Sequence, residues 1–178
     1  MKIKYLIYSI FLSISILSYS LALDIIEQRT LAFQDKCQIE LLPNGGITIH
    51  DQDETLNFDD TTKAVFNSGT GETVIEYSGI ATDKNEKRRW AKVIFAPDGR
   101  SLQHHHSKLV EDYYIIFAKE KLSVFIDNVE HFLSAGDHIQ ILPGQKHRVV
   151  NRSQQNECSL IVKCTPSWIV SDHILDPQ

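Results

Sequence analysis

Two short histidine-containing segments constrain the fold more than any other feature of this chain. The first, Q-H-H-H-S-K-L-V-E, carries His104, His106 and Glu111, and the second, P-G-Q-K-H-R-V-V-N, carries His147. Because side chains alternate along a strand, a strand over residues 102–106 places His104 and His106 on one face and His105 on the other. Three imidazoles and one carboxylate suit a divalent transition metal. The sequence therefore predicts a metal site assembled from two distant strands.

The residues between the two segments read as antiparallel β structure. An apolar run at 113–117 predicts a buried strand, and runs at 121–126 and 129–133 flank Asp127-Asn128, a plausible tight hairpin. Turn residues at 135–137 and 143–144 separate two further predicted strands, 138–142 and 147–150. We expect an antiparallel meander in which a turn at 107–110 pairs two strands and brings Glu111 beside the histidines.

The first segment resembles the first conserved motif of the cupin superfamily, G-x5-H-x-H-x3–4-E-x6-G. Here His104, His106 and Glu111 occupy the metal-binding positions of that motif. Gly99 precedes His104 by one residue too few, and Ala118 stands where the family has its second glycine. The departures fall on turn positions and leave the ligand pattern intact.

The second segment resembles the second cupin motif, G-x5-P-x-G-x2-H-x3-N. Four residues fall in register with it: Gly136, Gly144, His147 and Asn151. Leu142 occupies the proline position, and the proline comes one residue later. This resemblance implies an all-β fold, a double-stranded β-helix (jelly-roll barrel) with extra N-terminal strands. It also implies one divalent metal ion (Fe, Mn, Ni or Zn) held by His104, His106, Glu111 and His147, and a small-molecule ligand or substrate inside the barrel. A homodimer is a further expectation from the superfamily.

The resemblance leaves three functions open. The favoured one is a metal-dependent enzyme of the oxygenase or isomerase/epimerase type, acting on a small oxygenated substrate. The second is a non-catalytic module that binds a sugar or a carboxylate. The third is a sugar-phosphate isomerase, because S-L-Q-H-H-H resembles the C-terminal cupin of mannose-phosphate isomerase/guanylyltransferases. No general acid or base is assigned from the sequence; Tyr113 and Gln103 are candidates, with packing roles as the alternative.

The first 22 residues have the features of a secretory signal peptide. Lys2 and Lys4 precede an apolar run, and Ser20 and Ala22 are small residues at the −3 and −1 positions of a cleavage site. Residues 5–23 would just suffice for a transmembrane helix, but serines and tyrosines dilute the run. We expect an exported protein, periplasmic or secreted, without a stable membrane anchor after cleavage.

The mature chain, residues 23–178, is long enough for a single domain with its own core. Its formal charge of −7, compared with −5 for the whole chain, and the lack of a basic patch exclude nucleic acid as a partner. Residues 24–36 are the only helical candidate, and strands are expected at 37–42, 46–50, 62–66, 72–77 and 88–95. Four histidines are expected to have no ligand role: His50, His131, His138 and His173.

The three cysteines leave their pairing open. Cys158 and Cys164 flank a predicted strand too long for a disulfide to bridge its ends, since about 20 Å far exceeds the roughly 7 Å limit between Cα atoms. A disulfide would have to include Cys37, and three buried free thiols are the alternative.

Overall fold

A computed structural model describes residues 29–52, 54–58, 64–77 and 88–177, and the predicted signal peptide therefore lies outside the described residues. Apart from one short 3-10 turn, η1 (Val170–Asp172), every regular element among these described residues is a strand. The strands are β1 (Arg29–Ala32), β2 (Gln38–Leu41), β3 (Ile47–Asp51), β4 (Glu54–Phe58), β5 (Ala64–Asn67), β6 (Glu72–Glu76), β7 (Arg89–Phe95), β8 (His104–His106), β9 (Val110–Ala118), β10 (Leu122–Ile126), β11 (Val129–Leu133), β12 (His138–Ile141), β13 (His147–Asn151), β14 (Cys158–Thr165) and β15 (His173–Leu175). In the described part of the chain, no helix is long and apolar enough to cross a membrane.

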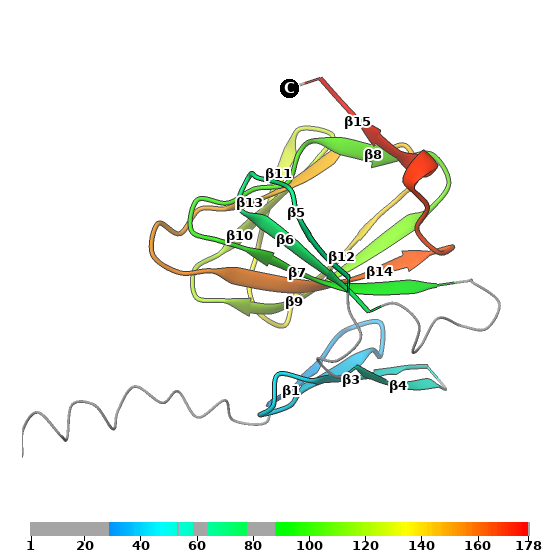
Figure 1. Ribbon diagram of the computed structural model, residues 1–178, viewed down its shortest axis with the longest axis vertical. Coiled ribbons are helices and arrows are strands. Elements are labelled where there is room, and N and C mark those ends of the chain that lie inside the picture. The colour runs from blue at the N-terminus through cyan, green and yellow to red at the C-terminus, as the bar shows by residue number, and fades with distance from the viewer. Residues whose placement is uncertain (1–28, 53, 59–63, 78–87, 178) are drawn as a thin grey trace, which may run out of the picture.

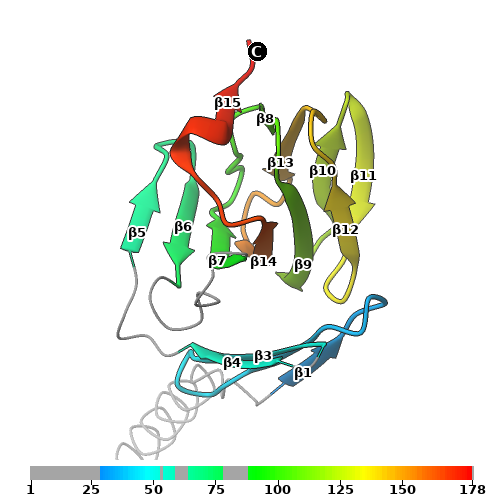
Figure 2. The ribbon, with the colours of Figure 1, turned by 90° about the vertical axis from the view of Figure 1, so that its right-hand side faces the viewer.

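The described strands form three antiparallel sheets. A five-stranded sheet, in the order β11-β10-β13-β8-β15, faces a six-stranded sheet, in the order β12-β9-β14-β7-β6-β5. Together they make the barrel seen in Figure 1, and a four-stranded sheet, β1-β2-β3-β4, lies against it. Figure 2 shows the four-stranded sheet below the barrel, beside β7, β14 and β9. The all-β barrel with added N-terminal strands is the architecture that the sequence predicts.

The central strands of the six-stranded sheet are buried on both faces. In β9, Tyr113 and Ile115 pack into the barrel core, whereas Tyr114 and Ile116 pack against the N-terminal sheet. This explains why residues 113–117 read as a continuous apolar run rather than as an alternating one. The strand thus contributes to two hydrophobic cores at once, one inside the barrel and one beneath it.

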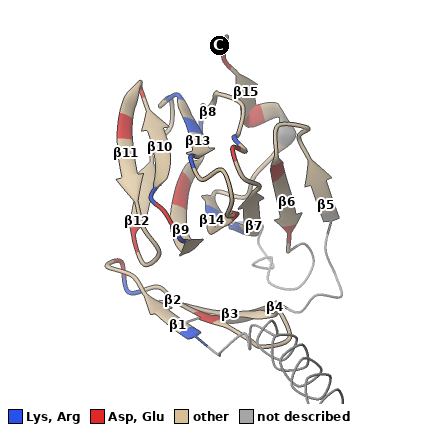
Figure 3. Ribbon diagram, turned by 90° about the vertical axis from the view of Figure 1, so that its left-hand side faces the viewer, with Lys and Arg blue, Asp and Glu red and all other residues tan. Residues whose placement is uncertain are grey.

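Charged side chains also link the N-terminal sheet to the barrel. Asp51 on β3 is 1% exposed, and its carboxylate lies 2.8 Å from Arg88 and 3.6 Å from Lys163 of β14. Lys163 also lies 3.6 Å from Asp112 of β9. Figure 3 shows acidic positions on β3 and on β9, in the two sheets that pack together. These buried charges are compensated across the interface, as burial requires.

The predicted hairpin at Asp127-Asn128 is confirmed, and a second hairpin joins the strands expected at 37–42 and 46–50. Asp127 and Asn128 join β10 to β11, and both have positive φ, 50° and 69°, which the primed two-residue turn demands. Asn44 and Gly45 lie in the turn between β2 and β3, where Gly45 has φ +83°.

Two other expectations are wrong. The segment from Gly99 to Asn151 is not a meander, because β8 pairs with β13 and β15 whereas β9 pairs with β12 and β14. The two strands flanking residues 107–109 therefore lie in facing sheets and share no ladder. The helical candidate at 24–36 is contradicted over residues 29–32, which form β1 and pair with β2; residues 24–28 lie outside the described part. Pairing with a neighbouring strand overrides the weak helical pattern there.

Candidate metal centre

The structure brings His104, His106, Glu111 and His147 together in the barrel. One potential ligand atom from each lies within 4.8 Å of the others, and all four residues are buried. His104 and His106 come from β8, and His147 comes from β13, where it lies directly opposite His104 in the ladder. Glu111 reaches the group from β9 in the facing sheet. The four side chains therefore come together because the two sheets of the barrel face each other, and not because β8 and β9 form a hairpin.

Backbone carbonyl groups fix the tautomer of each imidazole. The Nδ1 atoms of His104, His106 and His147 lie 2.9, 2.9 and 3.0 Å from the carbonyl oxygens of Leu102, Asp172 and Gln145. A carbonyl oxygen can only accept a hydrogen bond, so each Nδ1 carries the proton. In the neutral ring Nε2 then has a free lone pair, as a metal ligand requires.

The free nitrogen atoms gather around Glu111. Nε2 of His147 lies 2.9 Å from Oε2 of Glu111, and Nε2 of His106 lies 3.4 Å from Oε1. Despite these distances, both buried nitrogen atoms lack a hydrogen bond of acceptable angle. Buried polar atoms are normally paired, so these two require another partner. A divalent cation held by these two nitrogen atoms and the carboxylate would satisfy both, and the residues present fit a transition metal.

The electrostatics of the group also suit a cation. Burial opposes the charge on Glu111, but contacts with His106 and His147 outweigh it and hold the pKa of the carboxyl well below its usual range. Burial lowers the pKa of His104 to about 3, with the neighbouring His147 acting in the same direction, so its ring is neutral at physiological pH. Burial also opposes the charge on His106, but Glu111 raises its pKa on balance, so a bound metal would displace that proton.

Outside the cluster, His105 and His138 bind other carboxylates. His105 points away from the cluster, as strand alternation predicts, and its Nδ1 lies 2.9 Å from Oδ2 of Asp176. His138 stacks on Tyr114 and its Nε2 lies 3.0 Å from Asp112. Among the histidines expected to have no ligand role, His138 therefore behaves as a packing residue.

Comparisons with solved structures support the fold. An RmlC-like cupin from Shewanella frigidimarina aligns with a TM-score of 0.50 and 19% identity, over 62% of this chain and 90% of that one. The chain has the cupin fold. Pac13 from Streptomyces, in a variant with uridine, aligns at 0.55 and 12% identity, over 67% and 89% of the two chains. KdgF from Halomonas sp. aligns at 0.51 and 14% identity, over 62% and 93%. No protein-family model matches the sequence, and no curated protein matches it.

The C-terminal segment of the chain contacts two of the four clustered residues, which the sequence did not predict. Asp172 is buried, and its carboxylate accepts hydrogen bonds from the backbone N–H groups of Ser107, Lys108 and Leu109 at 3.1–3.2 Å and from the Ser107 hydroxyl. Its own carbonyl orients His106. The segment that joins His106 to Glu111 is thus anchored by a residue more than 60 positions away.

His173, which follows Asp172, also belongs to this region. Its ring stacks on His104 with centroids 4.2 Å apart and forms part of the wall of the barrel cavity. The sequence assigned His173 no ligand role, and it is not among the four clustered residues; its contact with His104 was not predicted. A single histidine in an aperiodic tail carries no signal that would have revealed it.

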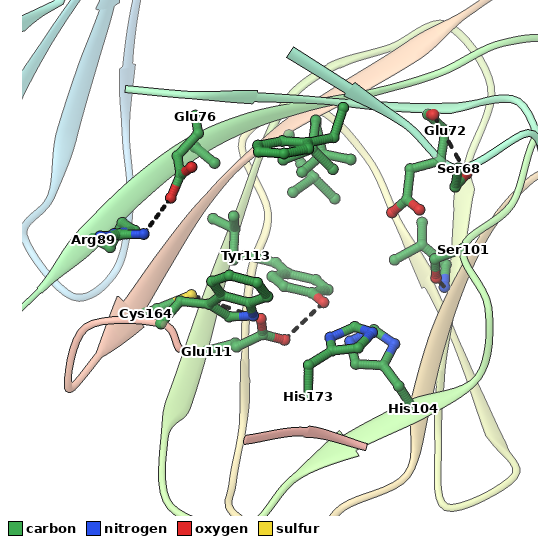
Figure 4. Close-up of a pocket in the computed structure, with 18 of the residues that line it drawn as sticks. Ser68, Glu72, Glu76, Arg89, Ser101, His104, Glu111, Tyr113, Cys164 and His173 are labelled. Atoms are coloured by element: carbon green, nitrogen blue, oxygen red, sulfur yellow. Dashed lines mark hydrogen bonds and ion pairs between the residues drawn. The ribbon is translucent and has the colours of Figure 1, made fainter. Parts of the chain in front are cut away.

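A cavity of about 340 Å³ inside the barrel is lined by two of the four residues, His104 and Glu111. Its wall is mainly apolar, and its polar side chains appear in Figure 4: Ser68, Glu72, Glu76, Arg89, Ser101, His104, Glu111, Tyr113, Cys164 and His173. The Tyr113 hydroxyl donates a 2.9 Å hydrogen bond to Glu111, and burial raises the pKa of Tyr113 well above its usual range. Tyr113 therefore orients the carboxylate and is a poor base. Gln103, the other candidate from the sequence, does not line the cavity.

The three cysteines Cys37, Cys158 and Cys164 are free and buried. Cys164 lies beside the centre, with its sulfur 3.7 Å from Oε1 of Glu111. Burial raises the pKa of this thiol well above its usual range, so the neutral thiol donates to the carboxylate.

Proposed function

We propose that this chain is an exported, metal-dependent cupin enzyme that acts on a small oxygenated molecule in the barrel cavity. One observation carries the proposal: three imidazoles of fixed tautomer and an ionised carboxylate lie together beside a cavity in the barrel. Such a donor set binds a divalent transition metal, and the cavity size falls in the range of small-molecule sites.

The chemistry divides between the ion and the chain. A divalent metal bound at the four residues would supply a Lewis acid that polarises an oxygen atom of the substrate. The chain supplies orientation, because Tyr113 holds Oε2 of Glu111 and three backbone carbonyls hold the imidazoles. The apolar wall, which includes Val93, Phe95 and Leu160, excludes water from the reacting atoms.

The two alternative functions have less support. A sugar would bury several hydroxyl groups against a mainly apolar wall, which is costly without hydrogen-bond partners. A sugar phosphate would require cationic groups, and Arg89 is the only Lys or Arg among the described cavity residues. That guanidinium already donates to Glu76 at 2.6 Å. A small molecule with an apolar body and one or two oxygen donors suits the cavity better.

Export is part of the proposal and rests on the sequence of residues 1–22 alone. We propose cleavage after Ala22 and release of residues 23–178 into the periplasm or the medium. A fusion of the first 22 residues to a reporter should be exported and cut at that bond. An uncut, membrane-bound fusion would contradict this part of the proposal.

Elemental analysis tests the metal assignment. The purified protein should carry close to one transition-metal ion per chain, and His104→Ala or His147→Ala should remove most of it. His105→Ala is the matched control, because its ring points away from the cluster, and it should keep the ion. Greater loss of metal in His105→Ala than in the other two variants would refute the site.

Turnover distinguishes an enzyme from a binding module. The iron-loaded protein should consume O₂, or convert the compound, with at least one member of a panel of phenols, diketones and sugars, and His147→Ala should not. Tight binding of panel members without any conversion would instead favour a non-catalytic module.

A further inference from the structure

Glu72 on β6 lies on the wall of the cavity that also contains the metal centre. Figure 4 shows its carboxyl group pointing into the cavity from the side opposite Glu111 and His104. β6 belongs to the same six-stranded sheet as β9, which carries Glu111, but β14 and β7 lie between the two strands. The residue is half-buried, and the sequence assigned it no role.

Glu72 differs from the two other carboxyl groups that line the cavity. Glu76 is paired with Arg89 at 2.6 Å, and Glu111 contacts His106, His147 and Tyr113. In the described part of the chain, Glu72 has no ion pair with a cation. Of the three, it alone has neither a cationic partner nor a place among the four clustered residues, so it can gain or lose a proton without breaking a salt bridge.

The surroundings of Glu72 favour reversible protonation near neutral pH. Burial raises the pKa of its carboxyl to about 7, the negative charge of Glu111 acts in the same direction, and a hydrogen bond with Ser68 opposes both. The other titratable groups of the cavity wall are Glu76, Arg89, His104, Glu111, Tyr113, Cys164 and His173. Arg89, the only permanent cation among them, is bound to Glu76 and compensates that carboxylate instead.

We propose that Glu72 is the general acid–base group of this site, exchanging a proton with a substrate held at the metal centre. This inference rests on the proposed function. The substrate class is a small molecule with a weakly acidic O–H, or a C–H next to a carbonyl. When an O–H bond breaks, its electron pair stays on the oxygen; when a C–H bond breaks, its electron pair forms the C=C bond of an enolate and the carbonyl π electrons move to the oxygen. In either case the proton moves to a carboxylate oxygen of Glu72. The same carboxyl then returns the proton to the substrate or product, so no oxidant or reductant is consumed by the step.

Infrared difference spectroscopy tests the proton-holding role without any substrate. The zinc-loaded protein, titrated from pH 5 to pH 9, should lose a protonated-carboxyl C=O band with a midpoint above the ordinary glutamate value, because burial, the largest cause of the raised pKa, does not depend on the metal. The band should be absent in Glu72→Gln and should persist, shifted in frequency, in Glu72→Asp. Glu76→Gln, which removes the paired carboxyl of the same strand, is the control and should keep it. A band that survives in Glu72→Gln, or a Glu72 that titrates near the ordinary value of about 4.3, would overturn the proposal.

Kinetics test the catalytic role separately. With any panel compound that the protein converts, Glu72→Gln should lower kcat by about 10²–10⁴-fold, the usual contribution of a positioned acid or base. Its metal content should equal that of the wild type, and the exposed Glu157→Gln variant should leave kcat unchanged. If metal-loaded Glu72→Gln turns over as fast as the wild type, the acid–base role of Glu72 is refuted and the proposed function is not. If none of the histidine variants loses metal, the proposed function itself is refuted.

Discussion

Replacing Asp172 by alanine tests whether the C-terminal segment anchors the proposed metal centre. The carboxylate accepts three backbone hydrogen bonds from residues 107–109, and the wild-type side chain is 4% exposed. Ser107 and Lys108 are exposed, so their N–H groups can bind water in the variant, whereas Leu109 is 2% exposed and its N–H would lose its partner. Charge-assisted hydrogen bonds contribute about 1.5–3 kcal/mol, and a buried unpaired donor costs about 1–3 kcal/mol. We expect a loss of about 3 kcal/mol in unfolding free energy.

Urea unfolding of the metal-free protein measures this loss. With an m-value of about 2 kcal/mol/M, the midpoint of Asp172→Ala should fall by about 1.5 M. Zinc affinity should also fall, by about 10–100-fold, because residues 107–109 connect His106 to Glu111. Asp137→Ala is the matched control: this exposed aspartate accepts one 2.7 Å hydrogen bond from its neighbour Ser134, and its loss should cost less than about 1 kcal/mol. Equal midpoints and equal zinc affinities for the two variants would refute the reasoning.

The same contact predicts a pH dependence. Burial opposes the charge on Asp172, but hydrogen bonds from Ser107, Lys108 and Leu109 outweigh it and hold the pKa below its usual range. A depressed pKa stabilises the fold fully above the unfolded value of about 3.9, and the stabilisation is lost as pH falls through the folded value. The difference between wild type and Asp172→Ala should therefore be constant at neutral pH and shrink below about pH 4.

Three other outcomes are expected. Asp51→Ala removes a carboxylate from beside Arg88 and Lys163, so it should destabilise the protein by about 3 kcal/mol and speed hydrogen exchange in β2 and β3. Unchanged exchange in these strands would contradict the ionic link to the barrel. Leu160→Ala, in the barrel core at 1% exposure, should cost about 3 kcal/mol in urea unfolding, and a cost below about 1 kcal/mol would mean that the core is poorly packed. Zinc affinity measured by competition with a chromophoric chelator should weaken as pH falls below about 7, because the imidazoles must be deprotonated to bind; a flat profile from pH 8 to pH 5 would argue against histidine ligation.

Local pattern predicted the parts of this molecule that local geometry controls. Alternation along a strand placed His104 and His106 on one face and His105 on the other, because this arrangement depends only on β8 being a strand. The hairpin at Asp127-Asn128 followed from two residues that tolerate positive φ. The motif spacing predicted that Glu111 and His147 would join the histidines, and the structure confirms that convergence.

The sequence pattern did not predict the features that depend on which strands pair in the folded chain. Hydrophobic periodicity does not encode which strand is a partner, so the division of β8 and β9 between facing sheets was missed and a meander was predicted instead. Asp172 and His173 lie in an aperiodic tail, and only the fold reveals that β15 pairs with β8 beside the ligands. Glu72 sits in a strand of mixed polarity, where its position on the cavity wall depends on the barrel closing around it.

Anomalous diffraction from crystals of the zinc-loaded protein tests the central claim most directly. The account predicts one strong peak at the zinc edge, about 2.0–2.2 Å from Nε2 of His104, His106 and His147 and from a carboxylate oxygen of Glu111. A peak at another group of residues, or an ordered cluster without a peak in crystals that contain saturating zinc, would contradict it.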